Sequence, residues 1–231
     1  MPDPIQLPDD TQRTAVVGRT GSGKTFAAVW LLANASFDEM PWVVVDYKND
    51  ELINGIARAE RISYDEVPDE PGIYILKVLP GDSEDGRTSE WLHKVWAQEN
   101  IGLYIDEGYM INPRDRWLNA CLTQGRSKHI PMIILSQRPV WLSRFVFSEA
   151  DFFVVFELTH EGDRDKVKEY IRDDAGLLEQ PLPLYHSYYY NVAAKDLRGL
   201  KPVPDGAALL AQIDQRLEAL EQPAGPYRRA L

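Results

Sequence analysis

Short apolar runs alternate with amphipathic segments along most of this chain. The runs are rich in β-branched residues and end at glycine or at polar residues, which predicts buried strands. The segments between them repeat apolar side chains every three to four residues, which predicts helices. The predicted strands are 14–18, 42–48, 73–79, 101–107, 131–137 and 151–159. The predicted helices are 21–35, 49–60, 89–100, 114–127, 141–150 and 162–173.

This alternation is typical of β–α–β units, so the sequence predicts an α/β fold. Its sheet should be mostly parallel and covered by helices on both faces. The C-terminal part has a different character, with tyrosines, prolines and a separate amphipathic stretch. There we expect an exposed or edge strand at 185–194, a linker at 199–206, a helix on a tether at 207–221 and a disordered tail.

Composition narrows the function without identifying it. The 231 residues suit one compact domain with tails. The 25 basic and 36 acidic residues give a net charge of −11, so any contact with DNA needs a local basic patch such as a pore. The four histidines are scattered and the single cysteine, Cys121, has no partner for a disulfide. We therefore expect no zinc site, and buried packing for Cys121 in a reducing compartment.

The start of the chain is acidic and proline-rich, unlike a signal peptide. Its apolar runs all fall short of the roughly 18 residues that a membrane helix needs. We therefore expect a soluble protein without a transmembrane segment.

The segment GRTGSGKT, residues 18–25, matches the phosphate-binding pattern G-x-x-x-x-G-K-[ST] between a predicted strand and a predicted helix. Its glycines let backbone N–H groups face phosphate oxygens at a helix N-terminus. Lys24 should reach the β- and γ-phosphates, and the Thr25 hydroxyl should bind Mg²⁺. The alternative is a glycine-rich turn that binds nothing. The predicted nucleotide contacts are Gly18, Arg19, Thr20, Gly21, Ser22, Gly23, Lys24, Thr25 and Phe26.

Two adjacent carboxylates, Asp106 and Glu107, end the predicted strand 101–107. Next to a phosphate cradle, Asp106 would hold Mg²⁺ through a water and Glu107 would polarise the attacking water. This division of roles suits ATP hydrolysis. The alternative is a polar strand end that caps the following helix.

Three segments carry a resemblance to a known family: VVVDYK at 43–48, YIDE at 104–107 and SQRP at 136–139. Together they resemble the FtsK–HerA superfamily of P-loop ATPases that pump DNA. Because the chain is small, it is most similar within this superfamily to the genome-packaging ATPases of tailless, tectivirus-like viruses with an internal membrane. The resemblance covers residues 12–160.

This resemblance implies several roles. The strand that ends at Gln137 would lie between the cradle strand and the carboxylate strand, with the Gln137 amide opposite the γ-phosphate as a sensor. Subunits would form a ring, most often a hexamer, with ATP bound between neighbours. An arginine of one subunit would complete the site of the next: Arg126 is the first candidate, before Arg138 and Arg144. Arg126 could instead be a cation that stabilises a helix C-terminus.

The implied cofactors are ATP and Mg²⁺, and the implied partner is double-stranded DNA, bound through its backbone without sequence reading. The basic residues that could line a pore are Arg114, Arg116, Arg126, Lys128 and His129. A viral vertex or a small membrane protein could receive the motor, in the host cytoplasm or on the virion. Asp46 and Lys48 belong to the shared pattern as structural or nucleotide-proximal groups.

Trp117, Tyr109 and the tyrosines at 185–190 could contact nucleic acid, but packing is the simpler interpretation.

The leading hypothesis is an ATP-driven translocase of double-stranded DNA that packages a viral genome. We divide the chain into an N-terminal segment 1–12, a P-loop ATPase core 13–198, and a linker, C-terminal helix and flexible tail 199–231. One alternative is a pump for conjugation or phage extrusion. Another, from a different class, is a P-loop kinase for a small molecule. A GTP-dependent switch is disfavoured because the chain lacks the N-K-x-D guanine-reading motif.

Overall fold

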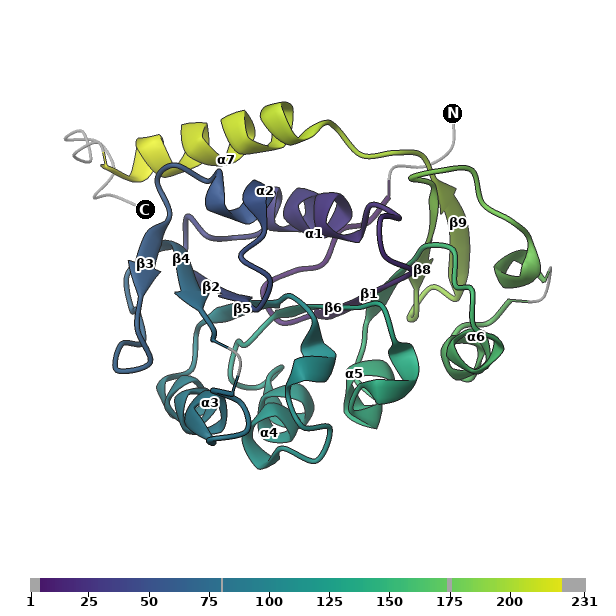
Figure 1. The fold of residues 1–231 in the computed structure, drawn as a ribbon. Helices are drawn as coiled ribbons and strands as arrows, with labels where there is room; N and C mark the ends of the chain where they lie inside the picture. The colour runs from purple at the N-terminus through teal and green to yellow at the C-terminus, as the bar shows by residue number, and fades with distance from the viewer. Residues whose placement is uncertain (1–4, 80, 174–175, 222–231) are drawn as a thin grey trace.

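The computed structural model describes residues 5–79, 81–173 and 176–221. Among these residues, nine strands form one sheet in the order β3-β4-β2-β5-β6-β1-β7-β8-β9 (Figure 1). The first seven strands in this order are parallel, whereas β8 pairs antiparallel with both of its neighbours, β7 and β9. The strands are β1 Arg13–Val17, β2 Pro41–Asp46, β3 Glu60–Ile62, β4 Gly72–Lys77, β5 Gly102–Ile105, β6 Met132–Ser136, β7 Phe152–Val155, β8 Ser187–Asn191 and β9 Asp196–Leu200. The predicted α/β fold with a mostly parallel sheet is confirmed.

Helices cover both faces of this sheet (Figure 1). The helices are α1 Lys24–Ala33, α2 Glu51–Asn54, α3 Arg87–Gln98, α4 Arg116–Gln124, α5 Arg144–Ser148, α6 Glu161–Lys168 and α7 Gly206–Glu221. Three short 3₁₀ turns accompany them: η1 Gly108–Met110, η2 Pro139–Trp141 and η3 Leu177–Glu179. Figure 1 shows α1, α2 and α7 on one face and α3, α4 and α5 on the other.

Strand β2 shows how the sequence supplies both faces of the core. Val43 and Val45 pack in the cluster that contains α3 and α4, whereas Trp42 and Val44 pack in the cluster that contains α1 and α7. Because successive side chains of a strand point to opposite faces, a continuous apolar run is what a strand covered on both sides requires.

Helix α7 packs on the body of the protein, where the sequence predicted a tethered helix. Its residues Leu209, Ile213 and Leu217 are buried in the same cluster as α1. The Arg216 guanidinium also donates a hydrogen bond of 2.8 Å to the carbonyl oxygen of Ala33, the last residue of α1. The predicted linker starts inside β9, so residues 201–205 alone connect β9 to α7. The predicted domain division stays a prediction, and the predicted flexible tail at 222–231 lies outside the described residues.

Two further elements differ from the sequence-based expectation. The helix predicted at 49–60 is one turn, α2, which starts after the Asp50 cap; Asp50 accepts hydrogen bonds from the amides of Leu52 and Ile53. The last residue of the predicted helix, Glu60, instead begins the short strand β3, which pairs with β4. The strand predicted at the edge, β8, is an interior strand because β9 pairs with its outer side.

Most packing roles predicted for single residues agree with the structure, but that of Tyr185 does not, because its side chain is 52% exposed. Cys121 is buried, and Tyr188, Tyr189 and Tyr190 of β8 are each at most 8% exposed. These three tyrosines therefore belong to the core. None of the helices in the described ranges is long and apolar enough to cross a membrane.

Candidate functional site

Three neighbouring strands bring the predicted site residues together at the carboxyl ends of the parallel strands. The strand order places β6 between β1 and β5, as the family resemblance implied. The P-loop follows β1, Asp106 and Glu107 follow β5, and Gln137 follows β6. Because these strands are parallel, their carboxyl ends lie together, which is where open α/β sheets bind ligands.

The P-loop backbone has the conformation that its glycines permit. At Gly18, an added Cβ would lie 2.4 Å from Cβ of Phe156, so only glycine fits against β7. Gly23 caps α1 in the left-handed region with φ 104°. The Lys24 ammonium group donates a hydrogen bond of 2.9 Å to the carbonyl oxygen of Arg19, which folds the side chain back over the loop. Gly23, Lys24 and Thr25, at the start of α1, line the same hollow.

That hollow is a cavity of about 330 Å³. It is lined by Thr20, Gly21, Gly23, Lys24, Thr25, Phe26, Lys48, Asp50 and Tyr185. Six of the predicted nucleotide contacts are in this lining. The Arg19 side chain turns elsewhere and forms an ion pair of 2.7 Å with Glu157. The Ser22 hydroxyl is buried and has no hydrogen-bond partner within the described residues.

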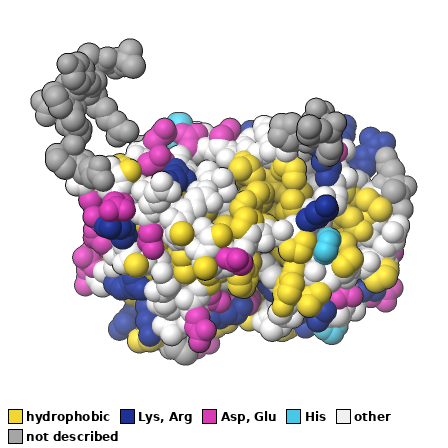
Figure 2. All heavy atoms as spheres, turned by 90° about the horizontal axis from the view of Figure 1, so that it is seen from above, with side chains coloured by type: hydrophobic (Ala, Val, Ile, Leu, Met, Phe, Trp, Pro, Cys, Tyr) yellow, Lys and Arg dark blue, Asp and Glu magenta, His cyan; other side chains and the backbone are white. Residues whose placement is uncertain are grey.

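A second cavity, of about 300 Å³, opens beside the first and shares Gly23, Phe26 and Tyr185 with it. Its other lining residues are Phe156, Ser187, Lys201, Pro202, Val203, Pro204 and Asp205. Phe26 and Tyr185 are 42% and 52% exposed, so their rings are available to a ligand. Figure 2 shows a band of hydrophobic side chains on the face seen from above. Sequence reasoning missed this cavity because Pro202, Val203 and Pro204 were interpreted as part of a linker.

The two carboxylates at the end of β5 are almost fully buried. Asp106 is 0% exposed and Glu107 is 1% exposed. Among the described residues, none of their four carboxylate oxygens has a hydrogen-bond partner. Lys48 compensates part of this charge: its ammonium group forms an ion pair with Glu107 and lies 3.9 Å from Oδ1 of Asp106. Glu107 also has a left-handed backbone, with φ 54°, which is unusual for a residue with a Cβ.

Burial shifts the pKa values of the charged groups that surround the phosphate cavity. Burial raises the pKa of Asp106 to about 6; the Lys48 cation opposes this, and the Asp50 carboxylate adds to it. Burial also lowers the pKa of Lys24 to about 8, together with the positive charge of Lys48 and against the attraction of Asp106. Both charged forms are therefore poorly compensated in the protein alone, and a ligand that carries phosphate and a cation would stabilise them.

A hard divalent cation such as Mg²⁺ fits these residues. The buried oxygens of Asp106 have no hydrogen-bond partner within the described residues, and Thr25, whose side chain carries a hydroxyl, lines the cavity. Carboxylate and hydroxyl oxygens are ligands that Mg²⁺ accepts beside phosphate. Across the described ranges, no group of three or more His, Cys, Asp or Glu side chains could hold a metal by itself. A cation at this site would therefore depend on the phosphates for part of its coordination.

Gln137 joins two parts of the site. Its Oε1 accepts a hydrogen bond from the Thr20 hydroxyl of the P-loop, and its Nε2 donates one of 3.0 Å to the Tyr109 hydroxyl. Tyr109 in turn packs edge-on against Trp141, with ring centroids 5.6 Å apart. Tyr109 thus contributes to packing, as expected, and also contacts a predicted catalytic residue.

None of the three candidate arginines is among the residues that line the phosphate cavity of their own chain. Arg126 forms an ion pair with Asp151, which precedes β7 at the opposite edge of the sheet. Arg138 is held by Asp163 at 3.0 Å. Arg144 is exposed and lies over the ring of Phe145. The structure does not bring any of them to the P-loop, so a role between subunits stays a prediction.

The predicted basic cluster is divided in the structure. Lys128 pairs with Glu99, and His129 lies 3.7 Å from Asp10. Together with Arg126 they lie near the amino ends of the parallel strands, on the side away from the P-loop. There the Asn100 amide donates a hydrogen bond to the Lys128 carbonyl. Arg114 and Arg116, in contrast, lie on the exposed segment after η1 and at the start of α4. Spacing in the sequence could not separate these two groups, because the helix α4 lies between them.

Comparison with known proteins places the chain in a family. No protein-family model matches it. It is 45% identical over 217 residues to DNA packaging ATPase P9 of Enterobacteria phage PRD1. The aligned residues cover 91% of this chain and 95% of that protein. The similarity therefore extends beyond residues 12–160, where the sequence motifs had placed it.

Solved structures agree on the fold. The genome packaging NTPase B204 of Sulfolobus turreted icosahedral virus 2, in complex with AMPPCP, has a TM-score of 0.66 at 18% identity, over 85% of this chain and all of that one. VirB4 of Thermoanaerobacter pseudethanolicus has a TM-score of 0.63 at 10% identity, over 89% of this chain and 93% of that one. The fold is that of the P-loop NTPases, and the chain belongs to the family of viral DNA packaging ATPases that includes P9 of phage PRD1.

Proposed function

We propose that this protein hydrolyses ATP to move double-stranded DNA into a viral particle, as one subunit of a ring. One observation carries the hydrolytic part: the buried carboxylates of Asp106 and Glu107, which share Lys48 as their nearby cation, follow β5 at the carboxyl end of the sheet, where the P-loop also lies. A kinase that transfers phosphate to a small molecule has no need of a second carboxylate to activate water. The family membership supports the packaging part.

The residues divide the chemistry as follows. The P-loop amides and Lys24 bind the phosphates, and Asp106 with Thr25 would hold Mg²⁺, which neutralises phosphate charge. Glu107 accepts the proton of a water whose oxygen bonds to the γ-phosphorus. The bond from that phosphorus to the bridging oxygen breaks, so ADP leaves with the bridging oxygen and inorganic phosphate is released. Gln137 orients the water and contacts the γ-phosphate, because its amide can both donate and accept.

The apolar cavity provides a place for the base of the nucleotide. It is continuous with the phosphate cavity through Gly23, Phe26 and Tyr185, so one ligand can occupy both. The rings of Phe26 and Tyr185 offer stacking surfaces to a purine. B204, which shares the fold, has been solved with AMPPCP, an ATP analogue. We therefore place adenine between α1 and the segment 201–205.

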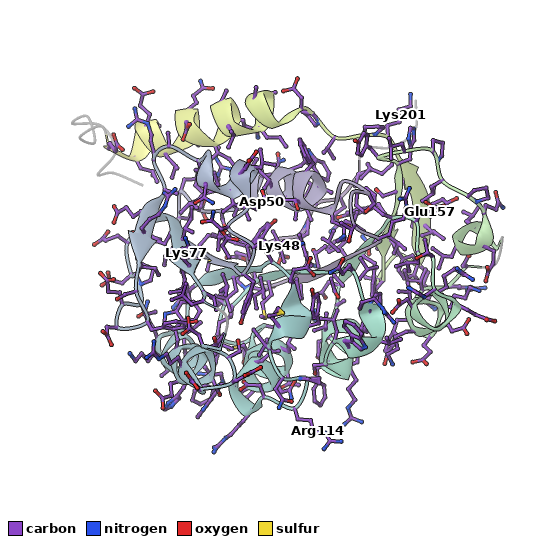
Figure 3. The ribbon with its side chains drawn as sticks, in the orientation of Figure 1. Lys48, Asp50, Lys77, Arg114, Glu157 and Lys201 are labelled. Carbon is purple, nitrogen blue, oxygen red and sulfur yellow. The ribbon has the colours of Figure 1, made fainter. Side chains whose placement is uncertain are left out.

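Three exposed arginines form the surface that would contact DNA: Arg114, Arg116 and Arg144. The Asn119 side chain joins their segments, because its amide donates to the Pro113 carbonyl at 3.3 Å and its Oδ1 accepts from the Ser143 hydroxyl at 2.7 Å. Figure 3 shows Arg114 at the outer side of the layer that contains α4 and α5. Guanidinium groups without acidic partners bind phosphates of any sequence, in a salt-dependent manner. This set replaces the five-residue cluster expected from the sequence.

A ring would supply an arginine to the phosphate cavity from a neighbouring subunit. The lining of the cavity contains two lysines but none of the candidate arginines. Arg126 lies near the amino ends of the parallel strands, whereas the P-loop lies at their carboxyl ends. A head-to-tail arrangement of subunits brings two such different surfaces together. We propose that Arg126 leaves Asp151 and enters the site of the neighbouring subunit. A hexamer, and docking to a protein at a viral vertex or in a membrane, remain part of this proposal.

Product analysis tests the hydrolytic assignment. Incubation with ATP should yield ADP and inorganic phosphate in equal amounts, with no phosphorylated acceptor, and duplex DNA should increase the rate. Glu107→Gln should bind ATP but hydrolyse it at least about 100-fold more slowly, because the amide cannot accept the proton. Glu157→Gln, which removes an exposed carboxylate near the P-loop, should retain turnover. Phosphate transfer to a small molecule, or full activity of Glu107→Gln, would reject the proposal.

A further inference from the structure

Lys48 has a backbone held by hydrogen bonds and a side chain that is partly exposed to solvent. It follows β2, and its amide donates a hydrogen bond of 3.1 Å to Oδ1 of Asp46. The amide of Asp50 donates to the same oxygen at 3.3 Å, so the turn after β2 is closed on both sides of Lys48. The Lys48 side chain, in contrast, is 40% exposed, although its ammonium group contacts a buried carboxylate.

The Lys48 side chain lies between the carboxylates and the place of the phosphates. On one side it forms the ion pair with Glu107 and approaches Asp106. On the other side it lines the phosphate cavity with Thr20, Lys24 and Thr25. Figure 3 shows Lys48 in the middle of the molecule, whereas Lys77 lies further toward the β3 edge. A rotation of a four-carbon side chain is enough to exchange one partner for the other.

The two partners have opposite consequences for Glu107. While Lys48 pairs with Glu107, its ammonium group occupies Oε1, so this oxygen is not available to a water. A triphosphate offers the ammonium group a more strongly charged partner, whereas ADP lacks the third phosphate.

We propose that Lys48 is a positioning residue that holds Glu107 in the empty and ADP-bound site and transfers its ammonium group to the γ-phosphate when ATP binds. Glu107 is then free to accept the proton of the attacking water. Lys48 thus couples the base to the presence of the third phosphate, so that Glu107 becomes active only when ATP is in place. This inference rests on the proposed ATP hydrolysis and adds its regulation.

The alternative role is structural: Lys48 would do no more than neutralise two buried carboxylates. The two roles differ in how the protein distinguishes ATP from ADP. A structural lysine affects both nucleotides alike, whereas a lysine that moves to the γ-phosphate contributes to ATP binding alone. The affinity ratio therefore separates them, and it needs neither metal nor turnover.

The experiment measures the equilibrium affinities of ATP and ADP by calorimetry, without divalent metal, for the wild type and for Lys48→Met, Lys48→Arg and Lys77→Met. We expect Lys48→Met to lose about tenfold or more in ATP affinity, which is the loss of one charge-assisted hydrogen bond, while ADP affinity stays within about twofold. Lys48→Arg should keep the preference for ATP. Lys77→Met removes a lysine at the same edge, in register with Asp46 on the neighbouring strand, and should behave as the wild type.

Retained ADP binding shows that Lys48→Met is folded. Equal losses for ATP and ADP, or no loss for either, would overturn the inference. The proposed function fails by a different result, since a wild type that binds ATP with the expected preference but never hydrolyses it would reject hydrolysis and leave the binding role of Lys48 standing.

Discussion

The Thr20 hydroxyl of the P-loop donates a hydrogen bond to the side-chain oxygen of Gln137 at the end of β6. The amide nitrogen of Gln137 donates to the Tyr109 hydroxyl at 3.0 Å, two residues beyond Glu107. One side chain therefore connects the loop that binds phosphate with the loop that carries the base. A γ-phosphate would compete for the same amide and thereby change both contacts.

Removing Gln137 or the Tyr109 hydroxyl that it contacts should lower turnover more than binding. We expect Gln137→Ala to bind ATP within about threefold of the wild type but to turn it over at least about tenfold more slowly, because the water loses its orienting group. Tyr109→Phe should have the same effect to a smaller degree, since Gln137 keeps its amide. Steady-state kinetics separates kcat from KM. Tyr64→Phe, which removes a comparable hydroxyl contact of 3.1 Å to Thr88 far from the P-loop, is the matched control.

Proton uptake should accompany nucleotide binding in alkaline solution. Burial lowers the pKa of Lys24 to about 8, so at that pH about half of the unliganded molecules carry a neutral lysine. Bound phosphate raises this pKa again, because it favours the charged ammonium form. Binding therefore takes up protons near this pH, and the affinity declines as the pH rises through it. Calorimetry in two buffers of different ionisation enthalpy measures the uptake, and an ATP affinity that is constant across this range would contradict the assignment.

Neutralising the exposed arginines should affect DNA and leave the basal reaction intact. We expect the double variant Arg114→Gln, Arg116→Gln to retain ATP turnover without DNA and to lose most of its stimulation by duplex. Each lost phosphate contact should reduce the salt dependence of DNA binding by about one unit of slope in log K against log salt. Arg58→Gln, an arginine paired with Glu218 and Glu221, is the control. Unchanged DNA stimulation in the double variant would remove this surface from the account.

Mixed subunits should reveal an arginine that acts on a neighbour. Arg126→Ala keeps its own P-loop but cannot complete the next site, whereas Lys24→Ala has a defective P-loop but still offers Arg126. Each variant alone should be inactive, and an equal mixture should regain up to about a quarter of wild-type turnover, the share of interfaces that combine both intact parts in a random ring. Asp151→Asn removes the Arg126 ion pair without the arginine and should remain active. No recovery in the mixture would argue against Arg126 as that residue.

The parts of the fold that local sequence determines were predictable. The strands at the centre of the sheet are continuous apolar runs because both of their faces are covered, and the P-loop is recognisable because its backbone requires glycines at fixed places. The strands β3 and β9 were missed because they lie at the two edges of the sheet. Their residues are half-buried or exposed, so no apolar pattern marks them.

Contacts between distant segments could not be predicted from the chain. The ion pair of Lys48 with Glu107 depends on the pairing of β2 with β5 and on the turn that Asp46 closes. The apolar cavity combines Phe26, Tyr185 and residues 201–205, which come from three separate parts of the sequence. The adjacent carboxylates were identified because they follow an apolar strand directly, but their nearly complete burial is visible only in the fold.

The most direct test of the central claim is ATP turnover per subunit across a protein dilution series, with and without non-specific duplex DNA. A ring with sites completed by neighbours, moving along DNA, predicts turnover per subunit that rises with protein concentration and rises again when duplex is added. Turnover per subunit that is independent of both would mean a self-contained site without a nucleic-acid track, and would contradict the account.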